Sequence, residues 1–232
     1  MTRFVAICLT AFSIAGSLQG AVEPNPVRDA APPAIGSTVS SFSLKDIHRR
    51  PRALDAFKDK KAFVIVFIGA ECPLANLYVP TLIELHKEYA AKGVQFLAIN
   101  SNVQDSFLEV AAHAQERDVP FPVLKDFDHK AAEAMGAKRT PEAFVLDANR
   151  VIRYHGRIDD QYGIGFQREK PTRRDLKAAI DELLAGKPVS IAKTEASGCV
   201  IACARKPRVE GVVTYAKQVS RILQNRCQEC HR

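Results

Sequence analysis

The sequence predicts an α/β domain with a central mixed β-sheet flanked by helices. Two continuous apolar runs, 62–68 (AFVIVFI) and 94–100 (VQFLAIN), have the length and the β-branched content of strands buried on both faces. A segment with helical character follows each run, and 142–147 and 151–154 flank a tight turn typical of a hairpin. Strands that alternate with helices early and form a hairpin late predict a mixed sheet.

The remaining elements follow from apolar spacing and from turn residues. After Cys72, apolar residues recur at helical spacing until Gly93 ends the helix, and Pro171 opens a final helix over 172–185. In chain order we expect a short strand at 41–47, a loop or helical turn at 53–61, strands at 62–68, 94–100, 122–125, 142–147 and 151–154, and further helices at 106–117 and 129–135.

The beginning of the chain has the pattern of an exported protein. Arg3 precedes an apolar run at 4–15 and small residues follow, so we predict that residues 1–21 are a signal peptide that is cleaved. The run is shorter than the roughly 20 residues that span a bilayer, and an uncleaved anchor is the alternative. We therefore expect a periplasmic or otherwise exported protein that is not an integral membrane protein after cleavage.

The rest of the chain divides into a proline-containing linker (22–36), the α/β domain (37–188) and a basic tail (189–232). The tail is predicted to be irregular at first and helical over 215–225. Of the net charge of +7, most lies in the tail, since 187–232 holds nine lysines and arginines against three glutamates. The domain itself has no basic stripe interleaved with aromatic residues, so nucleic acid is not an expected partner.

Five cysteines remain after removal of the signal peptide: Cys72, Cys199, Cys203, Cys227 and Cys230. An odd number in an oxidising compartment leaves at least one thiol that no other cysteine of the chain can hold. The cysteines are therefore the first candidates for a chemical function.

Cys72 is the strongest candidate for a reactive thiol. It lies between a predicted buried strand and a helix whose first position suits Pro73, so its sulfur is placed at a helix N-terminus. Such a position lowers a cysteine pKa from about 8.5 to between roughly 3.5 and 7.5 and favours the nucleophilic thiolate. The negative charge of Glu71 opposes this effect. The alternative is a small buried apolar side chain.

Thr140 and Pro141 precede the predicted strand at 142–147 and suggest a cis peptide bond. The backbone beside this bond is predicted to lie near the thiol and to pair with an extended substrate. We therefore assign Cys72, Thr140 and Pro141 to the catalytic site, with Tyr78 and Glu71 as weaker candidates that shape its pocket.

Residues 37–187, about two thirds of the chain, resemble the thioredoxin-like redoxins, a group that includes the alkyl hydroperoxide reductase and thiol-specific antioxidant family. The matching motifs are AFVIVFI, GAECP, RTPEAFVLD and VIRYHGRIDD. The resemblance implies a thioredoxin-like fold, with Cys72 as the reactive thiol and Thr140-Pro141 as the substrate-facing loop. Two departures stand out: Ala75 occupies the position of the second cysteine of thioredoxins, and Gly69 that of the threonine or serine of peroxiredoxins.

The expected activity is that of an exported thiol-disulfide oxidoreductase or a thiol peroxidase, acting on a protein disulfide or a peroxide and recycled by a thiol reductant of unidentified kind. Cys199 or Cys203 is the candidate resolving thiol, and a local disulfide between these two is the alternative. The thiol chemistry needs no cofactor. Copper binding by Cys199 and Cys203 is a further alternative, but the sequence places no histidine or methionine beside the pair. A non-catalytic binding module is the other alternative.

Cys227, Cys230 and His231 fit the CxxCH signature of covalent c-type haem attachment. The helix before them resembles the first helix of cytochrome c domains, which makes an electron-transfer protein a further alternative. Only Arg232 follows, so the motif is also consistent with the front of a longer protein, a remnant, or an ordinary redox-active CxxC pair. The other histidines show no metal-ligand spacing, and we expect no metal site.

Overall fold

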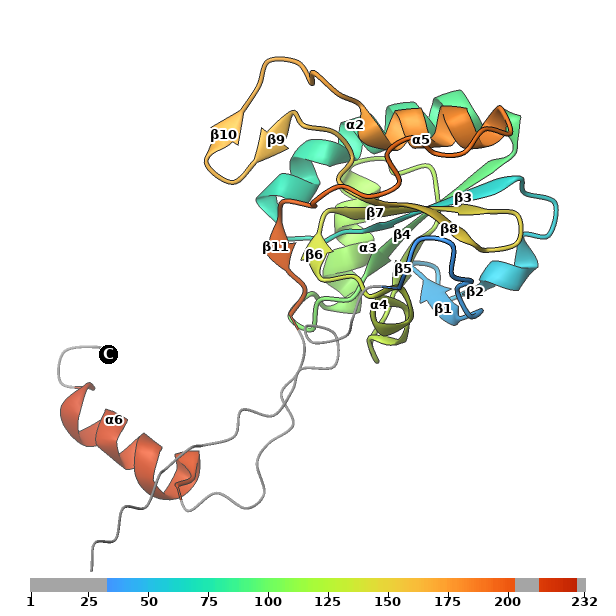
Figure 1. Cartoon of the computed structure of the whole chain (residues 1–232). Coiled ribbons are helices and arrows are strands. Elements are labelled where there is room, and N and C mark those ends of the chain that lie inside the picture. Colours follow the sequence, from blue (N-terminus) through green and yellow to red (C-terminus); the bar gives the residue numbers. More distant parts are fainter. Residues whose placement is uncertain (1–32, 203–212, 229–232) are drawn as a thin grey trace, which may run out of the picture.

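The computed structural model describes residues 33–202 and 213–228, and its centre is one twisted sheet with helices on both faces (Figure 1). The seven strands of this sheet lie in the order β2-β1-β5-β4-β3-β7-β8. Along the chain they are β1 (Ser43–Asp46), β2 (Pro51–Ala53), β3 (Ala62–Phe67), β4 (Val94–Asn100), β5 (Val123–Lys125), β7 (Glu142–Asp147) and β8 (Ile152–Gly156). β4 is parallel to β3 and β5, whereas β7 is antiparallel to β3. The predicted α/β fold with a mixed sheet is confirmed.

Two apolar cores separate the sheet from its helices. Helices α2 (Pro73–Tyr89), α3 (Phe107–Glu116) and α5 (Asp175–Leu184) pack on one face, and α4 (Lys130–Met135) and the short 3₁₀ helix η1 (Leu54–Ala56) pack on the other. Every residue of β3 is buried, which agrees with its continuous apolar sequence. A second 3₁₀ helix, η2 (Ala90–Lys92), ends α2 at Gly93, which adopts a left-handed φ of 91°.

Most predicted elements are present with shifted ends, and the final helix is the clearest correction. It begins at Asp175 and not at residue 172. The backbone N–H groups of Thr172 and Arg173 donate to the Asp160 carboxylate at 2.8 and 3.0 Å. These bonds hold the two residues outside the helix, where the sequence pattern placed them inside it.

Five short strands are absent from the sequence-based expectations: the three-residue β2 and four strands of two residues each. β9 (Tyr162–Gly163) and β10 (Phe166–Gln167) form a projecting hairpin, and β6 (Arg139–Thr140) pairs with β11 (Cys199–Val200) (Figure 1). Two-residue strands carry no periodicity of their own, so only the folded chain defines them.

The first part of the predicted tail lies against the domain. The N–H of His155 in β8 donates to the Ala192 carbonyl at 2.9 Å, and the N–H of Thr194 donates back to the His155 carbonyl at 3.0 Å. Further along, the Ile201 side chain is buried in the core on the α4 face. The segment after α5 therefore returns to the sheet, and its residues up to 202 reach the edge of β6.

The second described segment contains the helix predicted at 215–225. A π-helical turn, η3 (Tyr215–Val219), continues into α6 (Ser220–Arg226), and the Thr214 hydroxyl caps its start by accepting the Lys217 N–H. Among the described residues, no helix is long and apolar enough to cross a membrane. The predicted signal peptide, most of the linker, Cys203, Cys230 and His231 lie outside the described residues.

Candidate active site

Cys72 lies where the central strand β3 passes into α2. It is the N-cap residue of α2, and Pro73 is the first residue of the helix, as predicted. Only 4% of Cys72 is exposed, so its sulfur lies under the surface beside the helix N-terminus. The Ala75 N–H, in the first turn of α2, is one of the groups that stabilise its thiolate.

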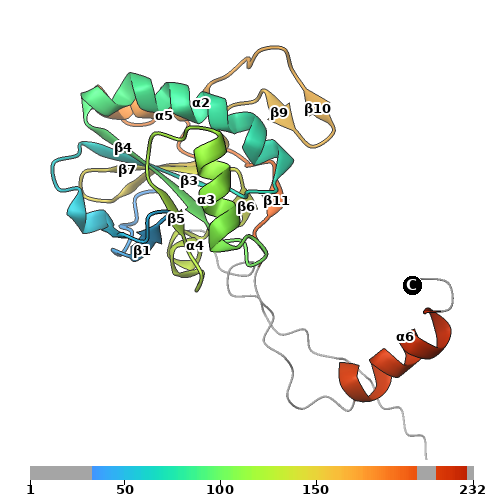
Figure 2. The ribbon, with the colours of Figure 1, turned by 180° about the vertical axis from the view of Figure 1, so that it is seen from behind.

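A second thiol, that of Cys199, lies beside Cys72 although it belongs to the segment that follows α5. β11 pairs antiparallel with β6 so that Cys199 lies opposite Thr140, and Figure 2 shows β11 beside β6 from the reverse side. The two Sγ atoms are 2.9 Å apart, and the Cys72 S–H is 3.0 Å from the Thr140 carbonyl oxygen, to which it can donate. The Thr140-Pro141 peptide bond is cis, as predicted. The structure thus brings together Cys72, Thr140, Pro141 and Cys199.

The two thiols have opposite pKa shifts. Burial acts to raise the pKa of Cys72, but hydrogen bonds from the Cys199 thiol, from the Thr140 side chain and from the Ala75 N–H outweigh it, and the net pKa is lowered. Burial and the hydrogen bond and charge of Cys72 raise the pKa of Cys199 to about 11. Of the two thiols, Cys72 is therefore the one that ionises first, and the proton stays on Cys199.

Polar residues after β4 support the loop that carries Cys72. The Asp105 carboxylate accepts the Ala70 N–H at 2.9 Å and the Asn102 side-chain amide at 3.3 Å. A Cβ on Gly69 would lie 2.5 Å from the Asn102 Nδ2 and 3.1 Å from the Cys72 Cβ. The position that carries threonine or serine in peroxiredoxins therefore has no room for a side chain here.

A buried lysine completes this support. Lys125 is 3% exposed, and its Nζ donates to the Asn100 Oδ1 at 2.8 Å and to the Asn102 carbonyl oxygen at 2.5 Å. Burial lowers the pKa of Lys125, and the nearby charges of Asp105 and Asp126 act against that shift. Sequence analysis missed this cluster. Its signal is the polar stretch that directly follows the apolar strand β4, since parallel strands place functional side chains at their carboxyl ends.

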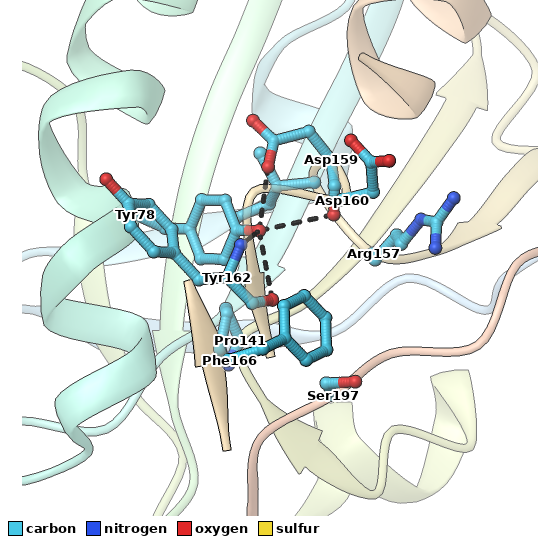
Figure 3. Close-up of a pocket in the computed structure, with 9 residues that line it drawn as sticks. Tyr78, Pro141, Arg157, Asp159, Asp160, Tyr162, Phe166 and Ser197 are labelled. Carbon is cyan, nitrogen blue, oxygen red and sulfur yellow. Dashed lines mark hydrogen bonds between the residues drawn. The ribbon is translucent and has the colours of Figure 1, made fainter. Parts of the chain in front are cut away.

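A small pocket lies beside Pro141 of the cis bond (Figure 3). Pro141 and Ser197 line it, and they are the neighbours of Thr140 and Gly198. The Tyr78 hydroxyl donates to the Asp159 Oδ1 at 2.7 Å and accepts the Tyr162 N–H at 3.2 Å. Burial raises the pKa values of both Tyr78 and Asp159, so Tyr78 stays neutral and ties the β9–β10 hairpin to α2.

The other predicted site residues are not gathered here. Glu71 is exposed, and Cys227 follows α6 as a half-buried free thiol. Cys203, the other candidate resolving thiol, and Cys230 and His231 of the CxxCH motif lie outside the described residues. The described part of the chain holds no group of three or more histidine, cysteine and acidic side chains that could bind a metal ion.

Comparison with known proteins shows the family of the chain. Residues 35–155 match the model of the AhpC/TSA family. The chain belongs to this family. The thiol-disulfide oxidoreductase ResA of Geobacillus thermodenitrificans (strain NG80-2) is 30% identical to this chain over 120 residues, covering 52% of this chain and 67% of the relative. Peroxiredoxin Q of Sedum lineare chloroplasts is 27% identical over 149 residues, covering 61% of this chain and 75% of the relative.

Two solved structures share the fold over most of the chain. A hypothetical protein from Sinorhizobium meliloti 1021 has a TM-score of 0.70 and 32% identity, covering 76% of this chain and 98% of its own. An uncharacterized conserved protein from Geobacillus kaustophilus has a TM-score of 0.68 and 30% identity, covering 75% and 94%. The fold is thioredoxin-like, and this AhpC/TSA chain is a thiol-dependent oxidoreductase.

Proposed function

We propose that the chain is a thiol-disulfide oxidoreductase in which Cys72 is the nucleophile and Cys199 is the resolving thiol. The observation that carries this proposal is the 2.9 Å approach of the two sulfurs across the β6–β11 pair. The second cysteine of thioredoxins is missing from α2, where Ala75 stands, and Cys199 supplies a thiol from β11 instead. The relative ResA is named a thiol-disulfide oxidoreductase, which is the activity proposed here.

The proposed reaction has two exchange steps. The Cys72 thiolate attacks one sulfur of a substrate disulfide, forms a mixed disulfide and releases a substrate thiolate. Cys199 then gives up its proton and attacks the Cys72 sulfur, which forms the Cys72–Cys199 disulfide and releases the second substrate thiolate. The protein loses two electrons, and the substrate leaves as a dithiol after it takes up one proton from Cys199 and one from water.

The electrostatics of the pair support this order. The Cys72 pKa is lowered, so Cys72 is the thiol that is ionised first. Its hydrogen bond and its charge are among the causes that raise the pKa of Cys199 to about 11. Both causes disappear when the Cys72 sulfur enters a mixed disulfide, because that sulfur is then neutral. Cys199 thus becomes easier to ionise at the step that requires its thiolate.

A thiol peroxidase is the second candidate function, favoured by the similarity to peroxiredoxin Q. In that reaction the Cys72 thiolate would cleave the peroxide O–O bond and become a sulfenic acid, and Cys199 would condense with it and release water. The crowding at Gly69 counts against this candidate, because no hydroxyl side chain fits there.

Mass-mapped oxidation of the reduced full chain tests both candidates. One equivalent of oxidised glutathione and one of hydrogen peroxide are compared in separate reactions. We expect a Cys72–Cys199 disulfide that forms faster with oxidised glutathione, and we expect Cys72→Ser to abolish it while Cys227→Ser leaves it unchanged. Faster reaction with peroxide would favour the peroxidase, and no Cys72–Cys199 disulfide with either oxidant would favour a non-catalytic binding module.

We also propose that the protein works after export, with residues 1–21 removed as a signal peptide, residues 37–188 as the redoxin domain and residues 189–232 as its tail. The support is the charged, apolar and small-residue pattern at the start of the chain. N-terminal sequencing of the protein from the periplasm of an expressing bacterium tests this. A mature chain that still begins at Met1 would contradict it.

Covalent haem at Cys227, Cys230 and His231 is proposed as an additional electron carrier on the strength of the CxxCH motif alone. The full chain produced with a cytochrome c maturation system should then show a haem absorption band that Cys230→Ser removes. Colourless protein from the same cells would contradict the proposal and leave the thiol chemistry unaffected.

A further inference from the structure

The segment 198–202 fills the edge of β6 at which an extended polypeptide would pair. Arg139 Nη1 donates to the Gly198 carbonyl at 3.0 Å, and the Ile201 N–H donates to the Lys138 carbonyl at 2.9 Å. A Cβ on Gly198 would lie 2.0 Å from the Thr140 carbonyl oxygen, so only glycine allows this close approach. The segment therefore lies against β6 as an added strand.

The same segment is held from its other side as well. The Ala202 N–H donates to the Asn102 Oδ1 at 3.2 Å, and the Val103 N–H donates to the Ala202 carbonyl at 2.9 Å. Ile201, at 1% exposure, anchors the strand in the core. The strand that carries Cys199 is thus fixed at both of its edges and by one apolar side chain.

The consequence is a large difference in exposure between the two cysteine residues. Cys72 is 4% exposed under β11, whereas Cys199 and its neighbour Val200 are exposed. An external thiol that approaches the folded chain meets Cys199 first.

We propose that the thiol reductant of this protein attacks Cys199, and not Cys72, when it reduces the Cys72–Cys199 disulfide. The inference rests on the proposed function, because it requires that disulfide to form. In most dithiol exchange reactions either sulfur can be attacked, and here burial behind β11 selects one of them.

The step balances as a disulfide exchange. A thiolate of the reductant bonds to the Cys199 sulfur, the bond between Cys72 and Cys199 breaks, and Cys72 leaves as a thiolate. A second thiol of the reductant then releases Cys199, so that a dithiol reductant becomes a disulfide. One of its two protons ends on Cys199, and the other is released to water while Cys72 stays a thiolate. The thiol with the lower pKa is the better leaving group, and in this pair that thiol is Cys72.

The test uses the full chain carrying Cys203→Ser, oxidised until mass mapping shows the Cys72–Cys199 disulfide. Reduced glutathione is added, the reaction is quenched with acid at short times, free thiols are alkylated, and the position of glutathione is mapped. We expect glutathione on Cys199 with Cys72 free to be at least about tenfold more abundant than the reverse. Glutathione mainly on Cys72, or equally on both, would overturn the proposal.

Gly198→Ala shows whether β11 causes the selectivity. The added Cβ should detach the strand from β6, expose Cys72 and bring the ratio of the two mixed disulfides toward one. Gly36→Ala is the matched control: Gly36 has a φ of +92°, so alanine strains the backbone, but a Cβ there has no neighbour within 4 Å. An unchanged ratio in Gly198→Ala would overturn the proposal. Failure of the starting disulfide to form in the chain that carries Cys203→Ser alone would instead contradict the proposed function.

Discussion

At the scale of single residues, the site is a pair of thiols in unequal environments. Hydrogen bonds from the Ala75 N–H at the helix N-terminus, from the Thr140 side chain and from Cys199 lower the pKa of Cys72, whereas burial and the neighbouring Cys72 raise the pKa of Cys199. A single substitution that removes one thiol must therefore change the ionisation of the other.

Cys199→Ala should raise the pKa of Cys72, because it removes the thiol whose hydrogen bond stabilises the thiolate. Alkylation of Cys72 by iodoacetamide follows the thiolate fraction, so the midpoint of its pH profile should move upward and the rate at pH values below it should fall. Cys227→Ala, a free thiol in the segment that contains α6, is the control and should leave the midpoint in place. A midpoint that stays constant or moves down in Cys199→Ala would contradict the assigned hydrogen bond.

At the scale of elements, the junction between β4 and α3 supports the thiol loop. Asp105 precedes the Ser106 cap of α3, and its carboxylate accepts hydrogen bonds from the Ala70 N–H and the Asn100 amide, the latter at 2.5 Å. The positive charge of Lys125 lies in the same buried cluster. The ends of β3 and β4 are thereby joined through polar groups that water does not reach.

Asp105→Asn should destabilise the fold by about 1–3 kcal/mol, because buried donors lose a charged acceptor and Lys125 loses a neighbouring negative charge. Urea unfolding of the reduced protein measures the free energy of unfolding. Asp128→Asn is the matched control, because that carboxylate is exposed beside Lys130, and its effect should stay within about 0.5 kcal/mol. Equal effects of the two substitutions would show that the cluster contributes no stability of its own.

At the scale of the whole molecule, the segment after α5 returns along β8 to the edge of β6. It thereby places Cys199 beside the start of α2. Cys72 and Cys199 are 127 positions apart in the sequence and adjacent in space. The close approach of the two thiols therefore depends on the complete domain together with the tail residues up to 202, and loosening of that segment should separate the sulfurs.

Ile201→Ala should lower the free energy of unfolding by about 2–4 kcal/mol, because the side chain is buried in the core on the α4 face. It should also speed alkylation of Cys72 through release of β11. Val200→Ala, at the adjacent and 51% exposed position, should change stability by no more than about 0.5 kcal/mol. Urea unfolding and iodoacetamide kinetics on both variants check this, and a Val200→Ala effect as large as that of Ile201→Ala would contradict the anchoring role.

Much of the fold and part of the site could be predicted from the sequence. Buried strands, the Cys72-Pro73 helix start and the cis bond before β7 depend on residues within a few positions of each other, and their patterns are visible in the chain itself. The predicted start of α5 was wrong because the Asp160 carboxylate accepts hydrogen bonds from two N–H groups that lie twelve and thirteen residues further along the chain.

The sequence alone determined that a thiol lies at the N-terminus of a helix in an α/β domain, because secondary structure and the position of a residue at a helix end are local. It left Cys199 and Cys203 as equal candidates and did not reveal the Asp105–Lys125 cluster. Only the tertiary structure showed that Cys199 lies beside the Cys72 sulfur and that the Asp105–Lys125 cluster supports the loop that carries Cys72. These contacts join segments far apart in the chain, and their geometry is set by how the sheet, the helices and the returning tail pack together.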